Sequence, residues 1–207
     1  MTASHHVPGV RSVIGVDAGT VSLREADHLV HRLADGLGLP DGTIACTHLV
    51  RTADRRGTTV SFALPDEAAA GTVWQRLTGL ADPEPDLGAV LGDRTHGPVP
   101  AARTAEAAVA EHVRRSGGRA VLYPGADRLT GTVTLADLLA TSAIERVVVV
   151  GAPFAAEPDP RTPVVTQDHV RPEWRDGRLT LALVPAAGGT LAPFEVPNPT
   201  PCCADHS

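Results

Sequence analysis

Three side chains near the end of this 207-residue chain have the chemistry of soft-metal ligands. Cys202 and Cys203 are adjacent, and His206 follows three residues later. Thiolate sulfur and imidazole nitrogen suit Cu(I) and Zn(II), and adjacent thiols can instead cycle between a dithiol and a strained disulfide. Alternating prolines from Pro197 to Pro201 predict a stiff, extended arm. The pattern therefore predicts a soft-metal or thiol-redox site on a C-terminal tail, residues 197–207.

An ion on this tail would need one more ligand, because three ligands fall short of a closed four-coordinate structural site. The fourth would come from Cys46, a distant histidine, a second chain or water. His28 and His31 are the next pair to consider, since their spacing of three can place two imidazoles on one metal. The chain has no zinc signature of the C-x-x-C or H-E-x-x-H type. Its other internal histidines are scattered one per predicted segment: His48, His96, His112 and His169.

A second candidate site is the loop from Tyr123 to Thr132, which leaves the carboxyl end of a predicted strand and runs toward a predicted helix. Open α/β sheets bind ligands at this place. Arg128 can clamp an anion bidentately, and Asp127 can serve as a base or metal ligand. Backbone donors near Thr132 can hold a phosphate or carboxylate. Tyr123, Asp127, Arg128 and Thr132 are therefore the candidate substrate-binding residues.

Composition limits the classes of partner and reaction. All 18 positive charges are arginine, so a lysine Schiff base and a P-loop lysine are excluded. The formal net charge of −6 argues against a nucleic-acid partner and against binding to an anionic membrane surface. Proteins bind both of these through basic patches. Hydrophobic residues make up 43% of the chain and charged residues 20%, as in globular proteins.

The sequence shows no pattern typical of a signal peptide or a membrane-spanning helix. The first eleven residues lack the cationic start and apolar stretch of a signal peptide. The longest apolar run, 147–156, is interrupted by Gly151 and Pro153 and is far shorter than the ~20 residues that span a bilayer. Three cysteines are too few for a disulfide framework. We therefore expect a cytoplasmic protein without a membrane partner.

The elements expected in residues 1–81 predict an α/β (α+β) lobe. A strand at 11–16 precedes a helix at 22–37, which begins with the capping box of Ser22 and Glu25. Strands at 43–51 and 58–64 flank a hairpin turn, and a helix at 66–80 follows. This order is the beginning of a split-βαβ, or ferredoxin-like, lobe.

The rest of the chain is predicted in four parts. Residues 82–103 contain four prolines and are interpreted as a linker or long loop. Residues 104–153 are predicted as a helix followed by a βαβ unit, in which strands 119–123 and 146–150 are adjacent, parallel and buried. A proline-punctuated β extension with a hairpin at Asp176 and Gly177 occupies 154–196, and the tail follows.

Residues 14–20, Ile-Gly-Val-Asp-Ala-Gly-Thr, resemble the first phosphate loop of the sugar kinase and actin superfamily. In that superfamily the loop joins two strands of a hairpin. Here the capping box at Ser22 predicts a helix directly afterwards, and no second loop of this type follows. The family is therefore rejected, and the segment is interpreted as a strand-to-helix turn.

Three functions remain open from the sequence. The preferred hypothesis is a small α/β protein whose tail binds Zn or Cu or performs thiol-redox chemistry. The first alternative is an enzyme that acts on a small anionic or phosphorylated metabolite at the 123–132 loop. The second is an adaptor that docks on a protein partner through its tail.

Overall fold

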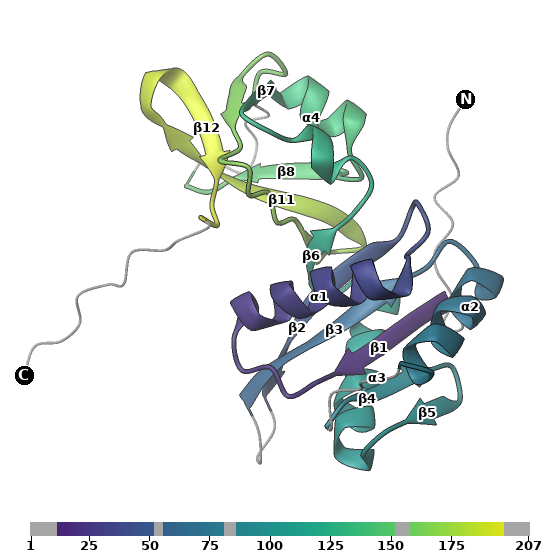
Figure 1. The fold of residues 1–207 in the computed structure, drawn as a ribbon. Helices are drawn as coiled ribbons and strands as arrows, with labels where there is room; N and C mark the ends of the chain where they lie inside the picture. The colour runs from purple at the N-terminus through teal and green to yellow at the C-terminus, as the bar shows by residue number, and fades with distance from the viewer. Residues whose placement is uncertain (1–11, 52–55, 81–85, 152–157, 197–207) are drawn as a thin grey trace, which may run out of the picture. The chain divides into compact units, whose positions relative to one another are not determined.

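The computed structural model of the chain describes residues 12–51, 56–80, 86–151 and 158–196. The described residues form four α-helices and twelve strands, which is the α+β class expected from the sequence (Figure 1). Contacts divide the chain into two compact units. Unit 1 comprises Met1–Pro124 with Glu173–Leu179, and unit 2 comprises Gly125–Pro172 with Thr180–Ser207.

Unit 1 is built on an antiparallel sheet with the strand order β5-β4-β1-β3-β2-β6-β10. Four of its strands and two helices follow the order β1-α1-β2-β3-α2-β4, so the expected split-βαβ lobe is present. The bounds of the strands are β1 (Val13–Asp17), β2 (Ile44–Arg51), β3 (Arg56–Ala63), β4 (Gly88–Leu91), β5 (Arg94–His96), β6 (Arg119–Leu122) and β10 (Glu173–Arg175).

Helices α1 (Leu23–Leu37) and α2 (Glu67–Thr78) begin within one residue of the predicted starts. The Glu25 N–H donates to Ser22 Oγ at 3.3 Å, and the Glu25 carboxylate accepts from the Val21 N–H at 2.8 Å. Asp66 caps α2 by accepting from the Ala69 N–H at 2.8 Å. These bonds satisfy helix-start donors that would otherwise lack partners, which explains why both helices begin where they do.

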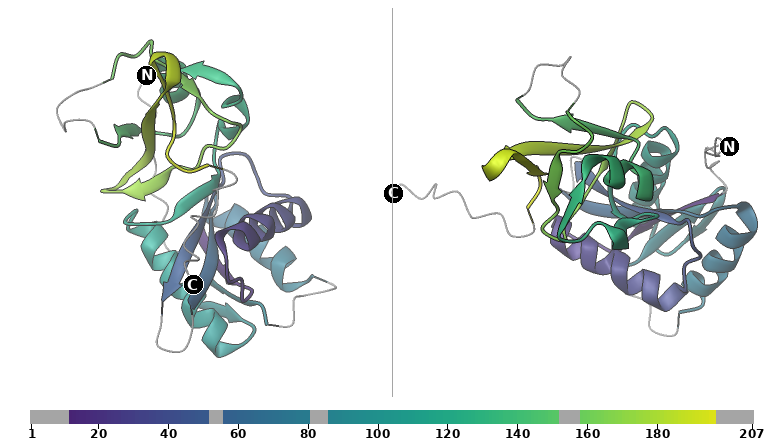
Figure 2. Two further views of the ribbon diagram at one scale, coloured as in Figure 1. Left: turned by 90° about the vertical axis from the view of Figure 1, so that its left-hand side faces the viewer. Right: turned by 90° about the horizontal axis from the view of Figure 1, so that it is seen from above.

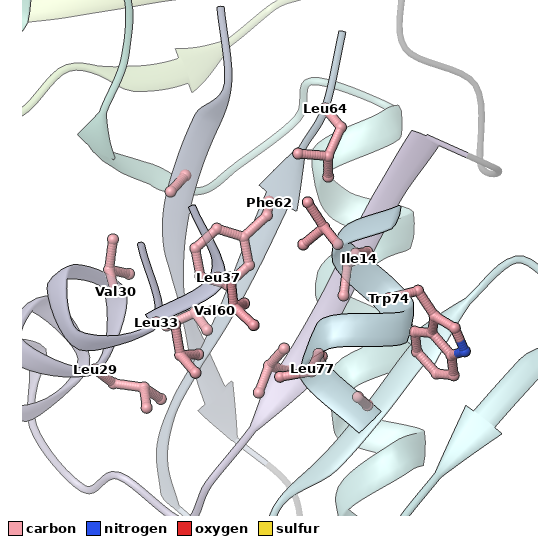
Figure 3. Close-up of a cluster of buried hydrophobic side chains, with 14 of the residues drawn as sticks. Ile14, Leu29, Val30, Leu33, Leu37, Val60, Phe62, Leu64, Trp74 and Leu77 are labelled. Carbon is pink, nitrogen blue, oxygen red and sulfur yellow. The ribbon is translucent and has the colours of Figure 1, made fainter. Parts of the chain in front are cut away.

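Both helices cover the same face of the unit 1 sheet, and an apolar core fills the space between them and the strands (Figure 3). Phe62 and Val60 from β3, Ile14 from β1 and Leu37 from α1 are almost completely buried in it. Burying side chains of this kind contributes about 1.5–3 kcal/mol each. This core is therefore the main source of stability on this face.

Helix α3 (Val99–Val113) packs on the opposite face, so the strands of unit 1 lie between α1 and α3 (Figure 2). The contact is very close. A Cβ on Gly15 would lie 2.3 Å from the carbonyl oxygen of Ala105, and Ala102 and Ala108 are also buried there. Only glycine and alanine leave room for a helix backbone at this distance from a sheet.

Residues 88–113 fold differently from the prediction, which placed a linker or loop at 82–103 and a helix from Thr104. β4 and β5 form within the segment 82–103, and α3 begins at Val99 rather than at Thr104. Pro98 and Pro100, two of the four prolines that favour a linker in the sequence, are the N-cap and the second residue of α3. Proline is accepted in the first helical turn, because the N–H that it lacks has no partner there.

The predicted pairing of strands 119–123 and 146–150 is wrong. β6 pairs antiparallel with β2 and β10. β8 (Arg146–Val149) is parallel, as expected, but its partner is β11 (Arg178–Ala186), and it is half-buried. The apolar pattern of a strand indicates that it is covered but does not identify its neighbour.

Unit 2 contains β7 (Thr132–Thr134), α4 (Leu135–Thr141), β8, β9 (Pro163–Val165), β11 from Thr180 onward and β12 (Thr190–Pro193). Its strand order is β11-β12-β9-β7, and β8 lies beside β11. The turn at Asp176 and Gly177 forms as predicted, with φ of 51° and 78°, although the strand before it is β10. Among the described residues, no helix has both the length and the apolar character to span a membrane.

Candidate functional site

The α3-facing side of the unit 1 sheet carries polar side chains. Cys46 and His48 on β2 stand opposite Ser61 and Thr59 on β3, and all four residues are buried. Side chains alternate between the two faces of a strand, so the intervening Val60 and Phe62 belong to the apolar core on the other face. Buried polar groups require hydrogen-bond partners, and α3 supplies partners for two of these residues.

Two residues of α3 and two residues of the sheet form a chain of hydrogen bonds, which we call the buried relay: Glu111, His48, Ser61 and His112. The Glu111 carboxylate lies 2.6 Å from His48 Nδ1. His48 Nε2 lies 2.7 Å from Ser61 Oγ, which in turn lies 2.7 Å from His112 Nδ1. The Glu111 side chain is 38% exposed, whereas the other three residues are buried. The relay thus runs from the surface to the space beneath α3.

The donors and acceptors of the relay can be assigned by counting protons. An ionised carboxylate only accepts, so His48 Nδ1 carries a hydrogen. With both imidazoles neutral, Ser61 donates to His48 Nε2 and accepts from the Nδ1–H of His112. His112 Nε2 is then an unprotonated lone pair, and it has no hydrogen-bond partner among the described residues. A buried lone pair without a donor costs less free energy than a buried imidazolium N–H without an acceptor, because the imidazolium is charged.

Burial and neighbouring charges set the protonation states of the relay. Burial lowers the pKa of His112 to about 3, and the neighbouring basic groups of His48 and Arg115 act in the same direction. The hydrogen bond from His48 lowers the pKa of Glu111 below its ordinary value, against the opposing effect of partial burial. Glu111 is therefore ionised and His112 neutral at neutral pH. Burial raises the pKa of the nearby Cys46 thiol, which keeps it protonated and unreactive.

Gly118 and Trp174 enclose the relay from the side of β6 and β10. A Cβ on Gly118 would lie 2.6 Å from Cε1 of His48, and the φ of Gly118 is 103°. Only glycine adopts this conformation easily and lets the backbone pass so close to the imidazole. The Trp174 ring centroid lies 6.1 Å from that of His112, and the Arg115 guanidinium lies 4.6 Å from the Trp174 centroid.

The connectivity of carboxylate, imidazole and hydroxyl is that of a serine–histidine–acid catalytic triad. Acyl transfer also requires that the hydroxyl reach a substrate carbonyl and that nearby N–H groups hold the oxyanion. Ser61 is completely buried, and β3 is paired with β1 on one edge and β2 on the other. The closed structure therefore does not present Ser61 for acyl transfer. It suits a relay that holds protons and attaches α3 to the sheet.

Two other polar contacts of unit 1 fasten neighbouring elements. Arg119 on β6 donates to both carboxylate oxygens of Asp27 on α1, at 2.6 and 3.1 Å. Asp17, at the end of β1, accepts from the Thr104 hydroxyl and from the Gly19 N–H. The second contact closes the turn between β1 and α1, which agrees with the interpretation of residues 14–20 as a strand-to-helix turn.

The four substrate-binding residues predicted on the 123–132 loop are divided between the two units. Tyr123 is buried in unit 1, whereas Asp127, Arg128 and Thr132 are exposed in unit 2. The Gly131 N–H donates to Asp168 Oδ1 at 2.8 Å, and Thr132 begins β7. An anion site on this loop stays a prediction, and it would depend mainly on the Arg128 side chain.

Backbone amides at the start of α4 are engaged within the protein. The Leu135 N–H donates to the Thr162 carbonyl and the Ala136 N–H to the Pro160 carbonyl. The Asp137 N–H donates to Thr134 Oγ1 at 3.1 Å, which caps the helix. These amides are thus occupied in this structure.

Cys202, Cys203 and His206, the predicted metal ligands, lie outside the described residues. Within the described ranges, no group of three His, Cys, Asp or Glu side chains is arranged to hold a metal ion. His28 and His31 are both exposed on α1. Cys46 lies in the middle of β2 and is buried, as expected for an inert thiol.

Comparison of the chain with protein-family models, with curated proteins and with solved structures finds no match. Its function must therefore be argued from its own residues.

The relay is not evident in the sequence, because His48 and His112 fall in separate predicted segments. The structure brings their ring centroids within 6.2 Å. One signal is present in the sequence: in β3, Val60 and Phe62 alternate with Thr59 and Ser61, and in β2, Cys46 and His48 share one face. Two strands with polar residues at alternate positions, when both faces are covered, indicate a buried polar layer.

Proposed function

We propose that this chain is a soft-metal-binding or thiol-redox protein that uses Cys202, Cys203 and His206. The observation that carries the proposal is three soft donors within five residues of sequence. Thiolate and imidazole together favour Cu(I) and Zn(II) over hard ions such as Mg²⁺. Of the three cysteines in the chain, Cys46 is buried with a raised pKa. The adjacent pair thus supplies the remaining thiols.

The two thiols can bind one ion only with a turn of the backbone, because adjacent side chains on an extended chain point to opposite sides. Ala204 and Asp205 provide the short reach that brings His206 round as a third ligand. A water, a second chain or another histidine would complete a four-coordinate site.

Metal titration of the full-length chain tests this proposal. We expect anaerobically purified protein to bind one Zn(II) or Cu(I) ion, and Cys202→Ser/Cys203→Ser to lose that binding. His28→Asn/His31→Asn is the matched control, because it removes the closely spaced histidine pair of α1. Equal metal content in the cysteine variant and the wild type would place the ion elsewhere.

The pH dependence of affinity provides a second test. Each thiol must lose its proton to bind, so affinity falls about tenfold per displaced proton for each pH unit below the thiol pKa. Two displaced protons predict a steeper loss than one. An affinity that does not change with pH would exclude thiolate ligands.

The redox form of the proposal is tested with glutathione disulfide. Oxidation of the pair forms one Cys202–Cys203 disulfide and releases two molecules of reduced glutathione, so electrons and protons balance. After unfolding, one titratable thiol, Cys46, should remain. Three remaining thiols together with no metal binding would contradict both forms and leave the enzyme and adaptor hypotheses.

A further inference from the structure

The buried relay fastens the last turn of α3 to the sheet through hydrogen bonds that depend on protons. Glu111 and His112 come from the helix, and His48 and Ser61 come from β2 and β3. Ser61 Oγ touches both imidazoles with a single hydroxyl proton. A proton added to His112 Nε2 leaves these hydrogen bonds in place, but it creates a buried N–H donor and a buried positive charge that have no partner there.

We propose that the buried relay is an acid-sensitive latch, in which protonation of His112 loosens the C-terminal half of α3 from the sheet and exposes Ser61 and Cys46. Its position, and not the presence of histidines alone, leads to this inference. His112 lies completely buried between helix and sheet, and its Nε2 has no hydrogen-bond partner among the described residues.

A proton on His112 finds no compensating charge in the closed structure. β2 contributes His48, and the residue two positions after the end of α3 is Arg115, so both ionisable neighbours that act on His112 are basic. Ser61 from β3 and Trp174 from β10 carry no charge. The nearest acid of α3, Glu111, is bonded to His48, and Asp17 of β1 is bonded to Thr104 and Gly19. Opening is the way in which the new N–H and its charge reach water.

The direction of the pH effect follows from linkage. The pKa of His112 is about 3 in the closed protein and has its ordinary value of 6.5 when exposed. Between these values the open form binds a proton that the closed form rejects. The open population therefore rises about tenfold for each pH unit of acidification in this window. Glu111 adds to this effect below its ordinary pKa of 4.5, because its closed-state pKa is lowered.

α3 should open before α1 and α2 because its apolar attachment is smaller. The cluster beneath α3 contains Val13, Ala63, Val90, Ala105 and Val109. The cluster on the opposite face contains nineteen buried residues, including Phe62, Trp74 and many leucines. Less buried apolar area means a lower free energy of local opening.

Hydrogen exchange on the full-length chain at about pH 7 and about pH 4.5, corrected for the intrinsic pH effect, tests the latch. We expect α3 to lose protection by tenfold or more while α1 keeps its own. His112→Asn should abolish the difference, because its amide can donate to Ser61 from near the Nδ1 position without titrating. His31→Asn, at an exposed helical position, should behave as the wild type does. Simultaneous loss of protection in α1 and α3, or an unchanged response in His112→Asn, would overturn the proposal.

The reactivity of Cys46 is a readout that does not depend on the folding of the His112 variant. In full-length Cys202→Ser/Cys203→Ser, Cys46 is the single thiol. We expect 4,4′-dithiodipyridine, a reagent that attacks thiols in acid, to label Cys46 faster at about pH 4.5 than at about pH 7, relative to the urea-unfolded chain at each pH. Labelling that is equally slow at both pH values would show that the latch stays closed and would refute the proposal.

Discussion

The two faces of the unit 1 sheet are stabilised in different ways. Beneath α1 and α2 the strands present Ile14, Val60 and Phe62, and the side chains that meet them are apolar. Beneath α3 the same strands present Gly15, Ser61 and, from β2, His48. One face is held by buried apolar area, whereas the other combines close backbone approach with a chain of hydrogen bonds.

The difference between the two faces shows how one sheet can combine a stable apolar core with a layer of hydrogen bonds that is sensitive to pH. Apolar burial is nondirectional and does not change with pH. Hydrogen bonds through imidazoles require a defined geometry and a defined number of protons. The α1/α2 face should therefore set the overall stability, and the α3 face should set how that stability responds to acid.

Phe62→Ala should produce the largest loss of stability, because its ring is fully buried in the α1/α2 face. A cavity of this kind costs about 3–5 kcal/mol. Urea unfolding at neutral pH measures the loss, and Leu49→Ala is a control, since Leu49 is 60% exposed. A loss below about 1 kcal/mol would mean that this face is not the main core.

Gly15→Ala should have the next largest effect, on the α3 face. The added methyl would meet the carbonyl oxygen of Ala105 and the Val109 side chain, so α3 must shift, at about 1–3 kcal/mol. Gly71→Ala in α2 is the matched control, because nothing lies within 4 Å of its added Cβ. That change should stabilise the protein by about 0.5–1 kcal/mol. Equal effects of both substitutions in thermal unfolding would contradict the close contact.

Ser61→Ala should have the smallest effect of the three, at about 1–2 kcal/mol, because it leaves one nitrogen on each imidazole without its partner. Ser116→Ala is the matched control: Ser116 is exposed, so its removal should change stability by less than about 0.5 kcal/mol. Measuring both variants by urea unfolding at neutral pH and in acid sharpens the comparison. If Ser61→Ala matches Ser116→Ala, the relay contributes nothing to holding α3.

Local signals predicted the N-terminal part of the fold well. The capping box at Ser22 and the helical spacing after it located α1, and threonine- and valine-rich segments located β2 and β3. The same rules failed for residues 88–113, where proline signals a break in one context and a helix start in another. They also failed to pair β6 and β8, because an apolar strand can accept several neighbours.

The candidate sites also differ in whether a local sequence pattern reveals them. Cys202, Cys203 and His206 are neighbours in sequence, so their chemistry could be recognised without a structure. His48 and Glu111 are separated by 63 residues, and Ser61 and His112 by 51. No local pattern connects residues so far apart.

The sequence by itself determined the α+β class, the starts of α1 and α2 and the soft donors of the tail, because capping and side-chain periodicity act over a few residues. Only the tertiary structure decided that β2, β3 and α3 meet at Ser61, and that His112 is buried there with a lowered pKa. Burial and partner identity depend on contacts between segments distant in sequence, and those contacts form only when the whole of unit 1 packs.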